Sequence, residues 1–217
     1  MWSRCDSRRY RIDAHRQHSS QNEGAPGMSP IVKICGITSA DDAQLSVDLG
    51  ARMVGLIFAE SPRRVSMAAA EQILKTIPDG VLRVGVFSDP CDPNIDSICS
   101  RVPLDLLQIY FGNDDSVNNT YTVPILAAFL INELSDLHAD RSFALYDFKN
   151  NPALLDSMSG HFAMEKALLA GGLNSDNVAG IVEKFSPLGV DVCSGVESTP
   201  RVKDRRKLEA FMKAVGV

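Results

Sequence analysis

Short apolar runs rich in β-branched residues alternate with helical patterns from Met28 to the C-terminus. Most of these runs are continuously apolar, which is typical of strands buried on both faces of a parallel sheet. The order of strand, helix and strand indicates βαβ units. Eight runs predict strands: Ile31 to Cys35, Met53 to Phe58, Leu82 to Phe87, Leu104 to Ile109, Thr122 to Leu126, Phe143 to Asp147, Ala167 to Ala170 and Val190 to Ser194.

Helix-start signals lie between the runs. We expect polar caps at Thr38 or Ser39, at Ser66, at Asp92 with Pro93 in the first helical position, and at Asn174 or Ser175. Gly50 is predicted to end the first helix, and a final charged helix is predicted from about Arg205 to Val215. Eight repeats of strand and helix predict an α/β fold, the (β/α)₈ or TIM barrel, with an open doubly wound sheet as the alternative.

The predicted barrel is small. The 190 residues from Met28 to Val217 fall just under the range of ~200 to 400 that is typical of this barrel. The fourth and fifth crossovers, Asn113 to Tyr121 and Asn132 to Arg141, leave room for only about two helical turns each. We therefore expect shortened outer helices.

Residues 1–27 differ from the rest in composition. They hold five arginines, two of the four histidines and the single tryptophan, with no apolar periodicity. Transit peptides are poor in acids, whereas Asp6, Asp13 and Glu23 interrupt this segment. We expect an extension over 1–27 that is disordered or lies upstream of the true start, and one catalytic domain over 28–217.

The composition narrows the classes of partner. A net charge of −5 argues against a nucleic-acid surface spread over the whole protein. The longest uncharged apolar stretch, Val123 to Ile131, is half of what a membrane span needs. Five cysteines without a CxxC pair or a secretory signal favour the cytoplasm. No metal is expected, because the nearest cysteine pair, Cys91 and Cys99, is separated by seven residues with no histidine between.

Two strand ends carry side chains suited to acid–base chemistry, and in a barrel the active site lies at the C-terminal ends of the strands. Cys35 ends the first strand before Gly36 and a helix start, where a thiol becomes more acidic. A small buried hydrophobe is the alternative interpretation. Asp147 ends the sixth strand and is either a general acid or a capping residue.

Four further features predict substrate contacts. Small-residue turns follow the seventh and eighth strands, and their backbone N–H groups suit a phosphate. One of Arg63 and Arg64, after the second strand, suits a carboxylate. Gln108, at the predicted end of strand four, suits the role of an uncharged residue that lines the site and forms hydrogen bonds. The residues of the two turns that we expect to bind substrate are Gly171, Gly172, Asn174, Ser194 and Gly195.

The motifs KICGIT, GLIFAESPRRVS, LQIYFG, ALYD, LLAGGLNSDNV and VDVCSGVESTPRVKD occur in this order. From Val32 to Ala214 the chain therefore resembles the phosphoribosylanthranilate isomerases, cofactor-free enzymes of tryptophan biosynthesis. The resemblance implies an Amadori rearrangement of N-(5-phosphoribosyl)anthranilate to 1-(2-carboxyphenylamino)-1-deoxyribulose 5-phosphate. It also implies that Cys35 is the base, Asp147 the acid, Arg63 the partner of the anthranilate carboxylate, and the glycine turns the phosphate site.

The chain departs from the family pattern at three places. Tyr110 replaces the usual histidine after strand four, the loop after Asp147 differs, and Arg201 stands where a glycine is usual. These changes keep a non-catalytic phosphosugar-binding barrel open as an alternative. A related aminoimidazole phosphoribosyl isomerase is a third hypothesis, but such enzymes resemble a two-aspartate arrangement, so Cys35 speaks against it. The sequence leaves the oligomeric state open.

Overall fold

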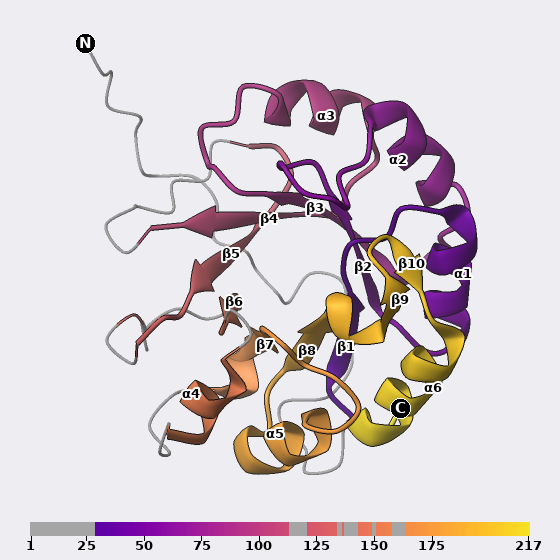
Figure 1. Ribbon diagram of the computed structural model, residues 1–217. Helices are drawn as coiled ribbons and strands as arrows, with labels where there is room; N and C mark the ends of the chain where they lie inside the picture. Colours follow the sequence, from indigo (N-terminus) through magenta and orange to yellow (C-terminus); the bar gives the residue numbers. More distant parts are fainter. Residues whose placement is uncertain (1–28, 113–120, 134–135, 137–142, 149–150, 158–163) are drawn as a thin grey trace, which may run out of the picture.

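A computed structural model describes residues 29–112, 121–133, 136, 143–148, 151–157 and 164–217. Eight parallel strands form a closed barrel in chain order, and β1 pairs with β8 to close it (Figure 1). The predicted barrel is therefore confirmed, and the open sheet is excluded. The strands are β1 Ile31–Ile34, β2 Met53–Ile57, β3 Leu82–Phe87, β4 Leu106–Phe111, β5 Ile125–Leu130, β6 Ala144–Asp147, β7 Ala167–Ala170 and β8 Gly189–Val192.

Short helices surround this barrel, as predicted, and in the described residues they are 6 to 11 residues long. A two-stranded hairpin, β9 Glu197–Thr199 with β10 Val202–Lys203, follows β8. No helix of the described residues is long and apolar enough to cross a membrane. The helices are α1 Ala40–Asp48, α2 Met67–Leu74, α3 Ile95–Arg101, α4 Pro152–Ser157, α5 Val178–Phe185 and α6 Arg205–Val215.

Two strands begin two or more residues later than the apolar pattern predicts. β4 starts at Leu106 rather than Leu104, because Leu104 bonds back to the Val102 carbonyl and packs in the core outside the barrel. β5 starts at Ile125 rather than Thr122, directly after Pro124, which has no N–H for the ladder. Both strands then run further than predicted, so Tyr110 and Phe111 belong to β4.

The predicted N-terminal caps of α1 and α2 are confirmed. Ser39 and Ser66 accept hydrogen bonds from Asp42 and Ala69, and Gly50, with φ of 105°, ends α1. The predicted caps of α3 and α5 were wrong. Asp92 accepts from the N–H of Asn94 in a turn, and α3 starts two residues later than predicted, at Ile95. The helix α5 starts at Val178, after Asn177 rather than after Asn174 or Ser175.

Alternate residues along each strand point into and out of the barrel. The inward positions form one apolar cluster that includes Met53, Val84, Leu126 and Leu168, and the outward positions pack against the helices. The inward pattern becomes polar towards the C-terminal ends of the strands, at Asp147 and Cys193. The predicted extension 1–27 and most of the fourth and fifth crossovers lie outside the described residues.

Candidate active site

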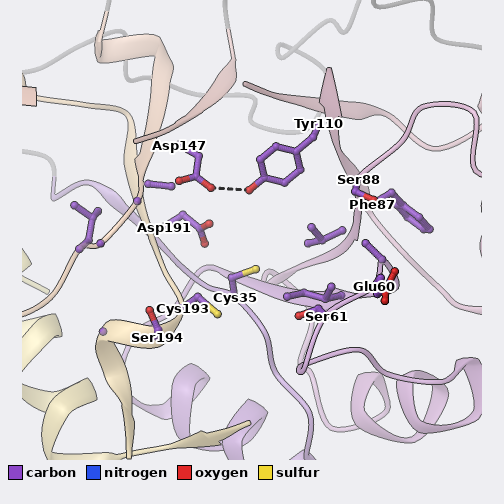
Figure 2. Close-up of a pocket in the computed structure, with 18 residues that line it drawn as sticks. Cys35, Glu60, Ser61, Phe87, Ser88, Tyr110, Asp147, Asp191, Cys193 and Ser194 are labelled. Carbon is purple, nitrogen blue, oxygen red and sulfur yellow. Dashed lines mark hydrogen bonds between the residues drawn. The ribbon is translucent and has the colours of Figure 1, made fainter. Parts of the chain in front are cut away.

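A cavity of about 400 Å³ opens at the C-terminal ends of the strands (Figure 2). Six of the nine predicted site residues line it, and β1, β6, β7 and β8 or the turns after them supply these six. The other lining residues include Tyr110, Asp191 and Cys193, which sequence reasoning did not place here. The predicted residues of the cavity are Cys35, Asp147, Gly171, Gly172, Ser194 and Gly195.

Cys35 follows β1 and is buried beneath the cavity, with 6% of its surface exposed. A hydrogen bond from the thiol of Cys193 and the positive charges of Lys33 and Lys203 lower the pKa of Cys35 well below its usual value, although burial opposes them. The same hydrogen bond, together with burial, raises the pKa of Cys193. Cys35 is therefore the thiolate of the pair and Cys193 the donor.

A buried ion pair lies under this thiolate. Lys33 Nζ donates to Asp191 Oδ1 at 2.9 Å, and the Lys33 side chain is fully buried. Burial alone would lower the pKa of Lys33, but Asp191 and Cys35 raise it, so the ammonium stays charged. Burial raises the pKa of Asp191 to about 7, against the opposing charge of Lys33. The cation thus supplies a fixed positive charge below the cavity.

Asp147 enters the cavity from β6, on the side opposite the cysteines (Figure 2). The hydroxyl of Tyr110 donates to Asp147 Oδ2 at 2.9 Å, and Gln108 Nε2 donates to the Tyr110 oxygen at 3.4 Å. Gln108 lies three residues before the end of β4, is buried, and does not line the cavity. The prediction that Gln108 ends strand four was wrong, because β4 continues to Phe111.

The two small-residue turns meet beside the cavity. Gly171 and Gly172 have φ of 102° and 71°, which side chains rarely adopt. A Cβ on Gly195 would lie 2.0 Å from the Leu173 carbonyl oxygen, so only glycine lets the turn after β8 approach the turn after β7. Asn174 does not line the cavity, because its side chain accepts from the N–H groups of Asp176 and Asn177.

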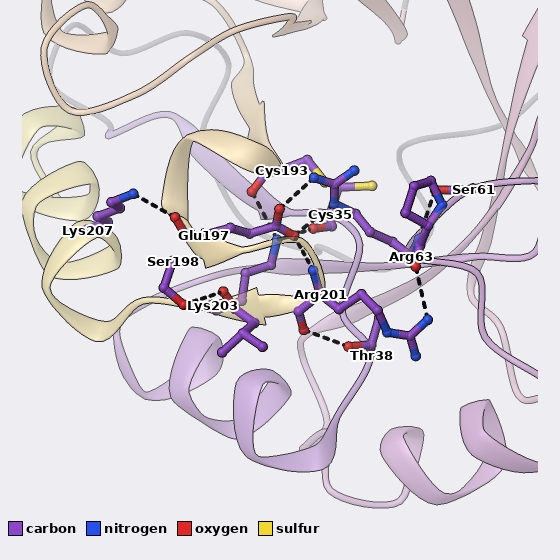
Figure 3. Close-up of polar contacts among 12 residues, drawn as sticks. Cys35, Thr38, Ser61, Arg63, Cys193, Glu197, Ser198, Arg201, Lys203 and Lys207 are labelled. Atoms are coloured by element: carbon purple, nitrogen blue, oxygen red, sulfur yellow. Dashed lines mark hydrogen bonds and ion pairs between the residues drawn. The ribbon is translucent and has the colours of Figure 1, made fainter.

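Arg63 is held at the edge of the site by Glu197 of β9 (Figure 3). Its Nε and Nη2 donate to the two carboxylate oxygens at 2.8 and 2.6 Å. Lys203 donates to the same carboxylate at 3.2 Å and to the carbonyls of Cys35 and Cys193. Burial would raise the pKa of Glu197, but Arg63 and Lys203 lower it. Arg63 itself does not line the cavity.

The sequence carried a signal for some of the residues that were missed. Lys33 and Asp191 each interrupt an apolar run at an inward position, which marks a paired charge inside a barrel. Tyr110 stood out only as a departure from the family pattern. Within the described residues, no cluster of three or more histidine, cysteine or acidic side chains has the arrangement of a metal site.

The family model of N-(5'-phosphoribosyl)anthranilate (PRA) isomerase matches residues 32–214. The chain belongs to this family. A PRA isomerase of Oceanobacillus iheyensis is 38% identical over 196 residues, covering 85% of this chain and 96% of the relative. One of Listeria welshimeri is 34% identical over 208 residues, covering 86% and 99%.

Solved structures of PRA isomerases share the barrel. The enzyme from Thermotoga maritima has 29% sequence identity and a TM-score of 0.75, with 86% of this chain and 98% of that chain covered. A PRA isomerase in complex with reduced 1-(o-carboxyphenylamino)-1-deoxyribulose 5-phosphate matches with a TM-score of 0.74, 29% identity and the same coverage. These matches favour the PRA isomerase interpretation over the aminoimidazole one.

Proposed function

We propose that the cavity at the barrel mouth isomerises N-(5'-phosphoribosyl)anthranilate for tryptophan biosynthesis, with Cys35 as base and Asp147 as acid. One observation carries these roles: a thiolate and a carboxyl group face the same cavity from opposite sides, beside paired glycine turns. A non-catalytic phosphosugar-binding barrel needs the turns, but it does not need a thiol with a lowered pKa.

The proposed reaction begins at the sugar ring. Asp147 gives its proton to the ring oxygen as the bond from carbon 1 to that oxygen breaks, and the nitrogen lone pair forms an iminium. The iminium makes the hydrogen on carbon 2 acidic, so the Cys35 thiolate removes it and an enolamine forms. Tautomerisation then gives carbon 1 a proton and takes one from the carbon 2 hydroxyl, leaving the aminoketose. No cofactor is required.

The remaining predicted residues take binding or supporting roles in this proposal. The turns at Gly171, Gly172, Ser194 and Gly195 hold the phosphate, where backbone N–H groups attract an anion. Arg63 meets the anthranilate carboxylate through Nη1, the guanidinium nitrogen that Glu197 does not hold. Gln108 supports Tyr110, and Asn174 fixes the turn after β7. A thiolate base also favours a reducing compartment, and we propose the cytoplasm.

The test follows consumption of freshly generated substrate by fluorescence, using the full chain and a chain that begins at Met28. Turnover by both is expected, with 28–217 as the catalytic domain. Cys35→Ser and Asp147→Asn should each lower kcat by about 10² to 10⁴, while both still bind the reduced product analogue. Cys91→Ser is the matched control, because Cys91 is an exposed thiol outside the cavity.

Two results would contradict the proposal. If the folded wild-type chain binds the analogue but does not turn over substrate, the protein is a non-catalytic phosphosugar-binding barrel. Undiminished turnover by Cys35→Ser, with Cys91→Ser as reference, would show that another group is the base.

A further inference from the structure

Tyr110 and Asp147 meet across the barrel interior although they lie on strands that are not neighbours. Tyr110 is in β4 and Asp147 ends β6, with β5 between them. Ala128 of β5 is the register partner of Tyr110, is fully buried and belongs to the interior cluster. A methyl side chain at this position leaves room for the tyrosine ring to reach from β4 to β6.

We propose that Tyr110 is a positioning residue that orients the carboxyl group of Asp147 for proton transfer, an inference that rests on the proposed function. The phenol donates to Oδ2 at 2.9 Å, which fixes the direction of the carboxyl group. Gln108 shares the inward face of β4 with Tyr110, two residues away, and donates to the phenol oxygen. Its bond directs the phenol hydrogen towards Asp147.

A phenol suits this task because it donates without bringing a charge. Burial, and then the charge of Asp147, raise the pKa of Tyr110, so that the hydroxyl keeps its proton. A cation at the same place would stabilise the carboxylate strongly and oppose its use as an acid. A neutral donor fixes the direction of the carboxyl group with less of this penalty.

Tyr110→Phe keeps the ring and removes the donor. We expect kcat to fall about 10-fold, the size of a lost hydrogen bond, with KM and analogue binding unchanged. Tyr110→His should restore part of the loss, since a ring N–H can donate to Asp147. Tyr121→Phe is the matched control, because the Tyr121 hydroxyl bonds the Pro90 carbonyl away from the cavity.

A double-mutant cycle with Asp147→Asn separates positioning from a general effect on packing. If Tyr110 acts through Asp147, Tyr110→Phe should change kcat little in the Asp147→Asn background. An equal fall in both backgrounds, or no fall in the wild-type background, overturns the inference alone. Absence of turnover in the wild-type chain overturns the proposed function and the inference with it.

Cys35 and Cys193 form a thiol pair at the ends of neighbouring strands (Figure 3). The preceding residues Ile34 and Val192 are register partners, and the Cys35 N–H donates to the Val192 carbonyl at 2.9 Å. Lys203 Nζ donates to the carbonyls of both cysteines, at 2.7 and 3.0 Å. Adjacent strands lie about 4.8 Å apart, within the range of Cα separations, about 4.4 to 6.8 Å, that a disulfide spans.

We infer, independently of the isomerase reaction, that this thiol pair is a site of reversible oxidation by hydrogen peroxide. The Cys35 sulfur attacks one peroxide oxygen, the O–O bond breaks and water leaves, giving a sulfenic acid. The Cys193 sulfur then displaces the hydroxyl as a second water and the S–S bond forms. Two thiols lose two electrons and two protons, and one peroxide becomes two waters. Both sulfur-bearing residues line the cavity, so peroxide has access.

Peptide mass spectrometry after peroxide treatment and alkylation of the full chain tests this pair without an activity measurement. We expect a peptide linked through Cys35 and Cys193 that dithiothreitol separates. In the Cys193→Ser variant, Cys35 should instead be oxidised to the sulfinic acid, which dithiothreitol does not reverse. The Cys91→Ser variant should form the Cys35–Cys193 link as the wild type does. Sulfinic acid at Cys35 of the wild type, or links only to other cysteines, would overturn the inference.

Discussion

The two sides of the cavity use different kinds of interaction. The ionic side, formed by β1, β8 and the β9–β10 hairpin, contains the Lys33–Asp191 pair and the carboxylate of Glu197 between Arg63 and Lys203. The neutral side, formed by β4 and β6, holds Asp147 through a hydrogen bond from the uncharged Tyr110, whose oxygen accepts a second one from Gln108.

This difference matches the two opposite demands of acid–base catalysis. A base must be deprotonated before the reaction and an acid protonated, and the same cavity must allow both. Buried cations on the ionic side favour the thiolate of Cys35, whereas a phenol positions Asp147 without adding a charge. In the proposed reaction, one barrel mouth thus surrounds its base with charges and its acid with a neutral donor.

The most severe test of the ionic side is Lys33→Met. The change leaves Asp191 buried without its partner, so the free energy of unfolding should fall by about 3 to 5 kcal/mol. Denaturant unfolding measures this loss. Adding Asp191→Asn should recover much of it, because the uncompensated charge is then gone.

Gln108→Leu is the matching change on the neutral side. In the described residues Gln108 Oε1 is a buried acceptor without a partner, so the substitution removes one weak bond and one unsatisfied atom. The expected loss is about 1 kcal/mol or less. Equal losses for Lys33→Met and Gln108→Leu would show that the two sides do not differ in the way described.

A pH-dependent effect, smaller than that of Lys33→Met, is expected from Glu197→Gln. At pH 7 the variant should lose about 2 kcal/mol, because charge-assisted bonds to Arg63 and Lys203 are weakened. The pKa of Glu197 is lowered in the folded protein, so its contribution is present above the unfolded pKa of about 4.3 and is lost as the pH falls through the folded pKa. Denaturant midpoints measured from pH 7 to pH 3 should therefore converge on acidification. A constant gap between wild type and variant would contradict the ionic role.

The alternation of continuously apolar runs with helical patterns was enough to predict the barrel, because each strand is buried on both faces and glycine or a polar cap marks most helix ends. Cys35, Asp147 and the glycine turns were predictable for the same reason: each ends an apolar run at the mouth. The later starts of β4 and β5 were not predictable. Leu104, for example, is apolar because it packs in the core outside the barrel, not because it belongs to the strand.

Contacts between distant strands were the part that the sequence could not supply. Tyr110 meets Asp147 only because β4, β5 and β6 close with a given register, and Arg63 meets Glu197 across 134 positions of sequence. Periodicity within one strand carries no information on such pairs. Asn174 shows the converse, because its place on a glycine turn suggested a ligand contact while its side chain serves the local backbone.

The smallest effect is expected at Arg201, an exposed charge on the ionic side that stands outside the buried pairs. Its φ of 82° is strained for a residue with a side chain, and its Nη1 donates to the Pro62 carbonyl at 3.0 Å. Arg201→Gly removes the strain and the exposed bond together and should stabilise the fold by up to about 1 kcal/mol. Arg201→Ala keeps the strain and loses the bond, so it should destabilise slightly. If thermal unfolding instead shows that Arg201→Gly is less stable than the wild type, then the exposed guanidinium contributes to the ionic side as the buried charges do.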